Sequence, residues 1–240
     1  MGATSGIGRE MAKLFARNGY SVGIAGRREN LLIDLMNEEP DILAYQVIDV
    51  NSEDAVQLLH NLINKLGGLD VYFHSSGIGY QNIPLDSSKE LTTVATNVLG
   101  FTRMMNAAFE YFSRTGFGQI AVISSIAGTK GLGAAPAYSA SKAFQSVYIE
   151  SLSQLAAIRK IKIHFTEIRP GFVSTDLLND GASYPMLMNK SAVAKKAFQA
   201  VSRRRKVVII DWRYKLLVGL WEIIPRSIWI KLPIHTKNTK

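Results

Sequence analysis

Along most of the chain, short apolar runs alternate with longer stretches in which apolar residues recur every three or four positions. The apolar runs are rich in β-branched and aromatic residues, and they predict strands at 20–25, 42–50, 69–74, 118–124 and 161–168. The intervening stretches predict helices at 10–17, 30–37, 53–65, 92–114 and 137–158. Because the strand runs are apolar at successive positions, we expect helices to cover both faces of their sheet.

Strands that alternate with helices in this way predict a parallel sheet, and therefore a Rossmann-like doubly wound α/β fold. The chain contains no internal repeat, low-complexity linker or Pro/Ser-rich hinge, which indicates a single domain. Ligands of such folds bind at the carboxyl ends of the strands, so we expect the site residues in the loops that follow the strands.

The composition is that of a chain with a sizeable hydrophobic core. Its 240 residues are 47% hydrophobic and 20% charged, which excludes a disordered protein. The lack of cysteine excludes disulfides, thiolate metal sites and a cysteine nucleophile. The first ten residues form no apolar leader, and the longest uncharged stretch, 115–129, is interrupted by Gly, Ser and Gln. We therefore expect no membrane-spanning helix and a cytoplasmic protein.

The formal net charge of +9 is concentrated near the C-terminus. Residues 203–240 hold 10 Lys and Arg against 2 Asp and Glu, which leaves 18 against 17 in residues 1–202. All three tryptophans, Trp212, Trp221 and Trp229, lie in the same basic segment. We therefore divide the chain into a body, 1–202, and a basic, Trp-rich C-terminal extension of the same domain, 203–240.

The C-terminal extension predicts a short strand at 207–210, an amphipathic helix at 214–224 and an apolar piece at 228–232. The expected apolar face of the helix consists of Leu216, Leu217, Leu220, Trp221 and Ile224. The expected polar face consists of Lys215, Gly219 and Glu222. A basic amphipathic hairpin is typical of a peripheral membrane contact, here through 212–232. A lid over an apolar substrate and a subunit contact fit the same pattern, and the sequence leaves all three open.

Several segments with specific chemistry fall at the ends of predicted elements. Residues 2–8, Gly-Ala-Thr-Ser-Gly-Ile-Gly, run directly into a helix, and such a loop lets backbone N–H groups approach a phosphate. Tyr138 and Lys142 are four residues apart on one predicted helix, so a phenol and an ammonium share a face. Ser125 follows a predicted strand, and Asn97 lies in another predicted helix. A phenol with a pKa of about 10 needs a neighbouring cation to exchange protons near neutral pH.

From residue 2 to about residue 176, the chain resembles the short-chain dehydrogenase/reductase family. Residues 2–8 match the family's cofactor-binding glycine motif, Asp49-Val50 its adenine-contacting dipeptide, and 138–142 its YxxxK signature. Three further segments resemble those with the family's catalytic Asn, its catalytic Ser and its nicotinamide-side loop, namely 96–100, 124–128 and 169–175. The resemblance implies an enzyme of the NAD(P)-dependent dehydrogenase/reductase type, which interconverts a carbonyl and a secondary alcohol.

The resemblance also implies which residues form the site. The catalytic set is Asn97, Ser125, Tyr138 and Lys142. The cofactor-binding set is Gly2, Thr4, Ser5, Gly6, Ile7, Gly8, Arg27, Arg28, Asp49, Val50, Ser76, Gly77, Tyr138, Lys142, Pro170, Gly171, Val173 and Thr175. In this family the Tyr is the general acid/base beside the Lys, the Ser hydrogen-bonds the substrate oxygen, and the Asn orders a water that links the Lys to solvent. The histidines lack the spacing of a metal site, and no metal is expected.

Arg27 and Arg28 determine which cofactor we expect. In a dinucleotide-binding fold, a carboxylate at the end of the second strand accepts hydrogen bonds from the ribose and repels a 2′-phosphate. Here that position reads Gly26-Arg27-Arg28, and an Arg offers a phosphate charge-assisted hydrogen bonds. The sequence therefore favours NADP(H) over NAD(H).

Two segments depart from the family pattern. Met1 stands where the family has a Thr, and the buried first strand before the glycine motif is absent from the chain. A native start further upstream, with Met1 an internal residue, would explain this, whereas a native start at Met1 would put cofactor binding and independent folding in doubt. The second departure is His74-Ser75, where the family usually has two Asn that help to fix the loop before Ser76-Gly77. We expect His74 to be a structural histidine.

The sequence therefore favours an NADP(H)-dependent oxidoreductase for an apolar or lipid-like small molecule, with 176–194 covering the substrate. The alternatives are a catalytically silent cofactor-binding regulator or scaffold, and a truncated inactive fragment. Nucleic-acid binding is not expected, because the basic residues of the C-terminal extension are interleaved with Leu, Ile and Trp. Family members usually pair through the helices that are here 92–114 and 137–158, so a homo-oligomer, a dimer or tetramer, is expected.

Overall fold

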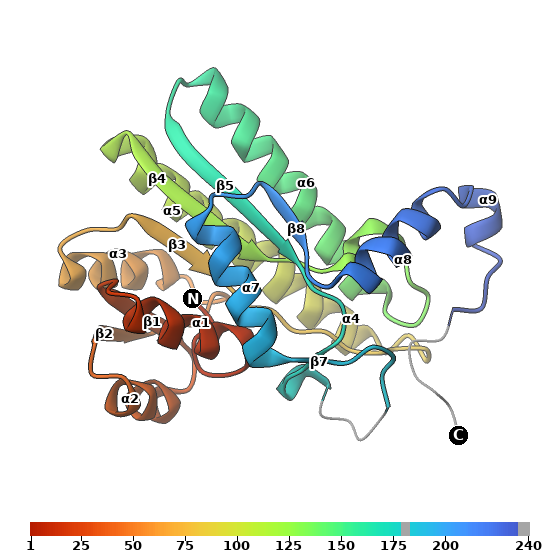
Figure 1. Ribbon diagram of the computed structural model, residues 1–240, viewed down its shortest axis with the longest axis horizontal. Helices are drawn as coiled ribbons and strands as arrows, with labels where there is room; N and C mark the ends of the chain where they lie inside the picture. The colour runs from red at the N-terminus through yellow and green to blue at the C-terminus, as the bar shows by residue number, and fades with distance from the viewer. Residues whose placement is uncertain (179–182, 235–240) are drawn as a thin grey trace.

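The strands of the computed structural model, which describes residues 1–178 and 183–234, are parallel and form an α/β fold (Figure 1). The larger sheet has the order β3 (Val71–His74), β4 (Phe117–Ile123), β5 (Lys162–Arg169) and β8 (Val207–Ile209). A separate pair consists of β1 (Val22–Gly26) and β2 (Ile42–Val47). A further short parallel pair, β6 (Val173–Ser174) and β7 (Met188–Asn189), lies beyond β5 in the sequence.

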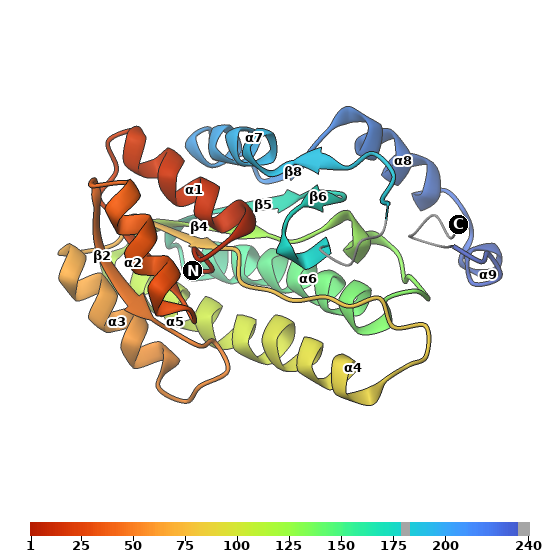
Figure 2. The same cartoon turned by 90° about the horizontal axis from the view of Figure 1, so that it is seen from below.

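Helices cover both faces of the sheet, as the apolar strands predict (Figure 2). One layer holds α1 (Gly6–Arg17), α2 (Glu29–Glu38) and α7 (Lys190–Ser202), in which α1 packs on α7. The other layer holds α3 (Ala55–Leu66), α4 (Ser87–Val94), α5 (Phe101–Thr115) and α6 (Pro136–Ile158), in which α4 packs on α6. The fold is therefore the predicted Rossmann-like arrangement.

The central strand β4 shows why the apolar runs form strands with two buried faces. Ile120 and Val122 belong to the core under α3, α5 and α6. Ala121 and Ile123 point the other way, into the core under α1 and α7. All four are at most 9% exposed, and each large aliphatic side chain buried in this way contributes about 1.5–3 kcal/mol.

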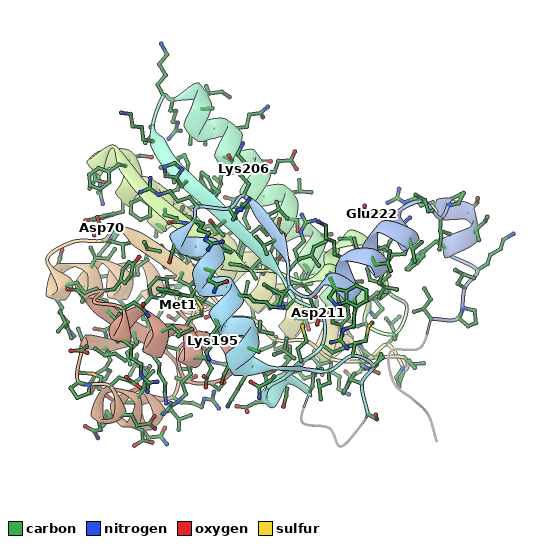
Figure 3. All side chains as sticks on the ribbon, in the orientation of Figure 1. Met1, Asp70, Lys195, Lys206, Asp211 and Glu222 are labelled. Carbon is green, nitrogen blue, oxygen red and sulfur yellow. The ribbon has the colours of Figure 1, made fainter. Side chains whose placement is uncertain are left out.

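The first three residues join the two strand groups. The Met1 amino group donates to the Phe73 carbonyl oxygen at 2.9 Å, and the Met1 carbonyl oxygen accepts from the Ser75 N–H at 3.0 Å. On the other side, the N–H groups of Gly2 and Ala3 donate to the Ala25 carbonyl oxygen at 2.8 and 3.0 Å. Met1 therefore lies between β1 and β3 and is partly buried (Figure 3).

Several boundaries differ from the predicted ones. The strand predicted over 42–50 ends at Val47, so Asp49 and Val50 lie in the loop after it. The helix predicted over 92–114 begins at Ser87, and its middle is a π-helical segment, Ala95–Gly100, that contains Asn97. Such segments widen a helix locally and are frequent at functional sites. Three further short helical elements are the 3₁₀ turns Ile126–Thr129 and Asp176–Leu178 and the helix α9 (Arg226–Trp229).

The amphipathic pattern predicted for the C-terminal extension is wrong in one respect. In α8 (Trp212–Glu222) the inner face consists of Tyr214, Leu217, Val218 and Trp221, which pack on the core under α1 and α7. Leu216, Leu220 and Gly219 instead lie on the exposed outer face with Trp212 and Ile223. Because α8 has apolar residues on both faces, its periodicity could not show which face would be buried.

Candidate active site

The predicted catalytic residues meet at the carboxyl ends of β3 and β4. Ser125 follows β4, and Tyr138 and Lys142 lie on the first two turns of α6. The Lys142 ammonium nitrogen is 5.7 Å from the centroid of the Tyr138 ring. Burial raises the pKa of Tyr138, whereas a hydrogen bond with the Ser125 side chain lowers it. The structure therefore brings the phenol, the hydroxyl and the ammonium together.

Lys142 is buried and is oriented by two acceptors. Its ammonium donates to the Ile123 carbonyl oxygen at 3.3 Å and to Gln145 Oε1 at 3.0 Å. Burial lowers the pKa of Lys142 to about 8, against the opposing effect of the Glu167 carboxylate, which raises it. The amine is therefore still mostly protonated at neutral pH.

Asn97 fixes the loop after β3. Its Oδ1 accepts from the Ile78 N–H at 2.9 Å, and its Nδ2 donates to the Ile78 carbonyl oxygen at 2.7 Å and to Ser141 Oγ at 3.1 Å. Gln145 Nε2 donates to the Asn97 carbonyl oxygen at 3.0 Å. The Gln145 amide thus connects Lys142 to the Asn97 carbonyl oxygen.

Sequence reasoning missed Gln145 and Glu167. Gln145 is fully buried and lies one turn after Lys142, and that spacing on one helix face could have identified it. Glu167 lies in the apolar run of β5, and its carboxylate accepts from Ser124 Oγ at 2.6 Å, Ser146 Oγ at 2.5 Å and the Arg169 guanidinium at 2.8 Å. Although burial raises the pKa of Glu167, these bonds hold it below its ordinary value. A carboxylate within an apolar strand was the available signal.

The glycine loop closes against the N-terminus of α1. Gly2 has a φ of 83°, which favours glycine, and a Cβ on Gly8 would lie 2.1 Å from the Gly2 carbonyl oxygen. No side chain therefore covers the backbone at these glycines, at the start of α1. The first N–H groups of a helix have no intrahelical partners and can bind a phosphate. Arg28 Nη2 donates to Thr4 Oγ1 at 2.9 Å and to Ser5 Oγ at 2.8 Å, which adds positive charge to the loop.

The other predicted cofactor residues divide into groups at the loop and groups in the core. Ser76 lies against Gly2, and the Thr175 methyl lies 3.2 Å from the position that a Gly6 Cβ would take. Ile7, Val50, Pro170 and Val173 are buried. Arg27 is exposed, and the Asp49 carboxylate accepts from the Asn51 N–H at 3.0 Å.

Gly77 and Gly171 lie at close approaches. A Cβ on Gly77 would lie 3.3 Å from Asn97 Oδ1 and 3.5 Å from the Lys142 ammonium. A Cβ on Gly171 would lie 2.2 Å from the ring of Tyr214, so α8 packs directly on the loop after β5. His74 is buried, its Nδ1 lies 3.0 Å from the Tyr72 hydroxyl, and burial lowers its pKa well below the ordinary value. It therefore stays neutral beside Lys142.

The donor set fits a nicotinamide dinucleotide. A glycine loop at a helix N-terminus and Arg28 can hold phosphates, and Gly79, in the loop after β3, lies against the Tyr138 ring. Within 1–178 and 183–234, no group of three or more His, Asp or Glu side chains has the arrangement of a metal site. The arrangement can hold a dinucleotide and exchange a proton at the Tyr138 oxygen.

Comparisons with solved structures agree with the fold. A short-chain dehydrogenase from Sphingobium yanoikuyae in complex with NADPH is 20% identical and has a TM-score of 0.77, covering 94% of this chain and 95% of that chain. An alcohol dehydrogenase from the archaeon Thermococcus sibiricus, complexed with 5-hydroxy-NADP, is 22% identical and has a TM-score of 0.75, covering 87% of this chain and 93% of that chain. These proteins share the fold described above.

Sequence comparisons identify the family. An uncharacterized oxidoreductase of Mycobacterium tuberculosis is 33% identical over 247 aligned residues, which cover 99% of this chain and 94% of that protein. The dehydrogenase/reductase SDR family member 7B of Xenopus tropicalis is 29% identical, covering 87% of this chain and 75% of that protein. The family described as short chain dehydrogenase matches residues 1–183. The chain therefore belongs to the short-chain dehydrogenase/reductase family of oxidoreductases.

Proposed function

We propose that this protein is an NADP(H)-dependent enzyme that interconverts a carbonyl and a secondary alcohol, with Tyr138 as the general acid/base. The proposal depends on the juxtaposition of Tyr138, Ser125 and Lys142, because this arrangement holds a proton donor beside a hydroxyl and a cation. When bound, the reduced nicotinamide supplies a hydride to the carbonyl carbon. Side chains of the protein transfer the proton and stabilise the developing charge.

In the reduction, the Tyr138 hydroxyl gives its proton to the carbonyl oxygen as that oxygen gains charge. Ser125 donates a hydrogen bond to the same oxygen and stabilises the developing negative charge. The phenolate that remains is stabilised by the protonated Lys142, which Gln145 and the Ile123 carbonyl oxygen hold in place. In the oxidation of the alcohol the proton returns to the phenolate.

We propose NADP(H) rather than NAD(H) because of the charge at the end of β1. Arg28 lies over the glycine loop through its bonds to Thr4 and Ser5, and Arg27 is exposed beside it. The Asp176 carboxylate oxygen lies 3.8 Å from Arg28 Nη1, which is too far for a hydrogen bond. This ion pair therefore does not use up the hydrogen-bond donors of the guanidinium. Steady-state kinetics with each cofactor tests this: kcat/KM should be at least about tenfold higher with NADPH than with NADH, and the reverse order would refute the preference.

We propose an apolar or lipid-like substrate because apolar and aromatic side chains surround the loop after β5. Phe172 and Tyr184 lie with ring centroids 4.9 Å apart, and Met186 packs in the same cluster as Phe172. The predicted cover, 176–194, includes residues 179–182, which lie outside the described residues. The described part of that segment is 176–178 and 183–194, which includes only the first turn of α7.

The reaction is tested by the substitution Tyr138→Phe. NADPH oxidation is followed with apolar ketones, 3-oxoacyl thioesters and steroids, and the variant should lose at least about a thousandfold in kcat while it still binds NADPH. Tyr148→Phe, ten residues further along α6, is the control and should stay within about threefold of the parent, since its hydroxyl contacts Asn106 outside the site. A parent that binds NADPH but turns over none of these carbonyls would favour a catalytically silent regulator instead.

We propose that the protein forms a homo-oligomer through the faces of α5 and α6 and the segment before α5. Large apolar side chains are exposed there, including Leu91 and Leu99 before α5 and Val147 on α6, at 67%, 63% and 62%. Analytical ultracentrifugation of the parent checks this, and a monomer at micromolar concentration would contradict it.

A further inference from the structure

The helix α8 is apolar on two opposite faces, and only its inner face packs on the protein. On the inner face Tyr214 and Val218 are 1% and 3% exposed. Four large apolar side chains of the outer face are between 53% and 77% exposed, namely Trp212, Leu216, Leu220 and Ile223. A contiguous exposed apolar strip of this kind, in contrast to single exposed side chains, marks contact with another apolar phase.

The strip continues onto α9 and the residues that follow it. Trp229 is buried, but Ile228, Ile230 and Leu232 are 51%, 78% and 42% exposed. Both helices project beyond the sheet at one end of the molecule (Figures 1 and 2). We call this surface, the exposed apolar residues of α8 and of 228–232, the outer apolar strip.

Cations flank the outer apolar strip. A groove between α7, β8 and α8 is lined by Trp212 together with four basic side chains, Lys196, Arg203, Arg205 and Lys215. Its one acidic side chain, Asp211, is already paired with Arg213 at 2.8 Å. Arg226 and Lys231 are exposed beside the other end of the strip. An apolar strip bordered by cations is complementary to a lipid surface with anionic headgroups.

We propose that α8 and α9 dock the protein on an anionic lipid surface, with the outer apolar strip at the acyl boundary and the flanking Lys and Arg at the lipid phosphates. A second copy of the chain fits less well, because a two-fold contact would set one strongly basic segment against another. None of the helices within 1–178 and 183–234 is long and apolar enough to cross a bilayer, so the docking is peripheral.

The docked surface is connected to the candidate active site. The Lys130 ammonium donates to the Ile224 carbonyl oxygen at 2.9 Å, and Trp229 Nε1 donates to the Gly131 carbonyl oxygen at 2.7 Å. Lys130 and Gly131 belong to the loop between Ser125 and Tyr138, so docking would hold that loop next to the lipid. This consequence rests on the proposed function, whereas the lipid contact itself does not.

The test is sedimentation of the full chain with vesicles of phosphatidylcholine, with and without phosphatidylglycerol. Deleting the C-terminal extension would remove the buried Tyr214, so exposed positions are substituted instead. Leu216→Glu should lower binding to the anionic vesicles at least about tenfold. Leu43→Glu is its matched control, because Leu43 on β2 is 58% exposed against 57% for Leu216, and it should bind as the parent does.

A second pair of variants tests the cations. Arg203→Gln/Arg205→Gln should bind about tenfold more weakly, whereas Arg114→Gln/Lys162→Gln, which removes two exposed cations elsewhere, should bind as the parent does. The proposal is overturned if the parent stays in the supernatant, or if Leu216→Glu and Leu43→Glu bind equally. It is also overturned if Leu216→Glu dissociates an oligomer in vesicle-free ultracentrifugation. NADPH oxidation with a small ketone, measured without vesicles, tests the proposed reaction separately.

Discussion

At the scale of single residues, the charge of Glu167 bears on the pH range in which Tyr138 can act. Burial lowers the pKa of Lys142 to about 8, so the ammonium that stabilises the Tyr138 phenolate is lost as the pH rises through this value. The Glu167 carboxylate opposes that loss, and two hydroxyls and Arg169 keep it ionised. Reductase activity should therefore decline above about pH 8.

The substitution Glu167→Gln tests this electrostatic role. It removes the charge but keeps the side-chain shape, so the alkaline limb of the kcat profile should move to lower pH. At about pH 9 the variant should be roughly tenfold slower than the parent, and near neutral pH it should be within about threefold. Ser146→Ala removes one hydrogen bond to Glu167 and leaves its charge, so its limb should stay in place. Equal movement of both limbs would mean that the effect is structural.

The sequence motifs predicted the residues that meet at the candidate active site but not the groups that hold them. Tyr138 and Lys142 could be predicted because their spacing places them on one face of a helix. Glu167 acts on Lys142 across the interface of β5 and α6, and that contact depends on the three-dimensional packing, whereas Gln145 lies one turn after Lys142 on the same helix. The hydrogen bond from Gln145 to the Asn97 carbonyl oxygen could not be read from spacing, because it joins α6 to the π-helical segment around Asn97.

At the scale of elements, prediction succeeded where one periodicity dominates. The strand β4 is apolar at successive positions, so a strand with two buried faces was predicted correctly. The helix α8 has a helical periodicity, but apolar residues lie on two of its faces. Which face is buried therefore depends on what the helix packs against. The face that carries Tyr214 is the buried one. The Tyr214 ring lies on Gly171, and its hydroxyl accepts from the Phe172 N–H at 3.1 Å and donates to the Pro185 carbonyl oxygen at 3.0 Å.

Tyr214 should therefore anchor α8 to the loop after β5. Tyr214→Phe leaves the Phe172 N–H without this acceptor and should cost about 1–3 kcal/mol of unfolding free energy. Tyr214→Ala also opens a cavity and should cost about 3–5 kcal/mol. Urea unfolding measures both, with Leu220→Ala on the outer face as a control that should change by less than about 0.5 kcal/mol. A Tyr214→Ala variant as stable as this control would refute the anchoring role.

At the scale of the whole molecule, the two strand groups depend on Met1, Gly2 and Ala3 for their hydrogen-bonded connection. In a protein that begins at Met1, the terminal amine lies between them, and burial lowers its pKa from 8.0 to about 5. The folded protein therefore holds this amine neutral at neutral pH, whereas the unfolded chain protonates it below about pH 8. At a pH between these two pKa values, unfolding is accompanied by the uptake of a proton. The free energy of unfolding therefore depends on pH in this range.

For a protein produced with Met1 as its first residue, the unfolding free energy should accordingly be highest above pH 8 and should fall as the pH drops from 8 to about 5. Over that interval the loss from this single group is at most about 4 kcal/mol. An otherwise identical protein acetylated at Met1 cannot titrate there but keeps an N–H for the Phe73 carbonyl oxygen. The difference in urea-unfolding free energy between the two proteins, measured across this range, isolates the contribution of the amine, because all other groups are the same in both. If that difference does not change with pH, the amine is solvated rather than buried in the sheet.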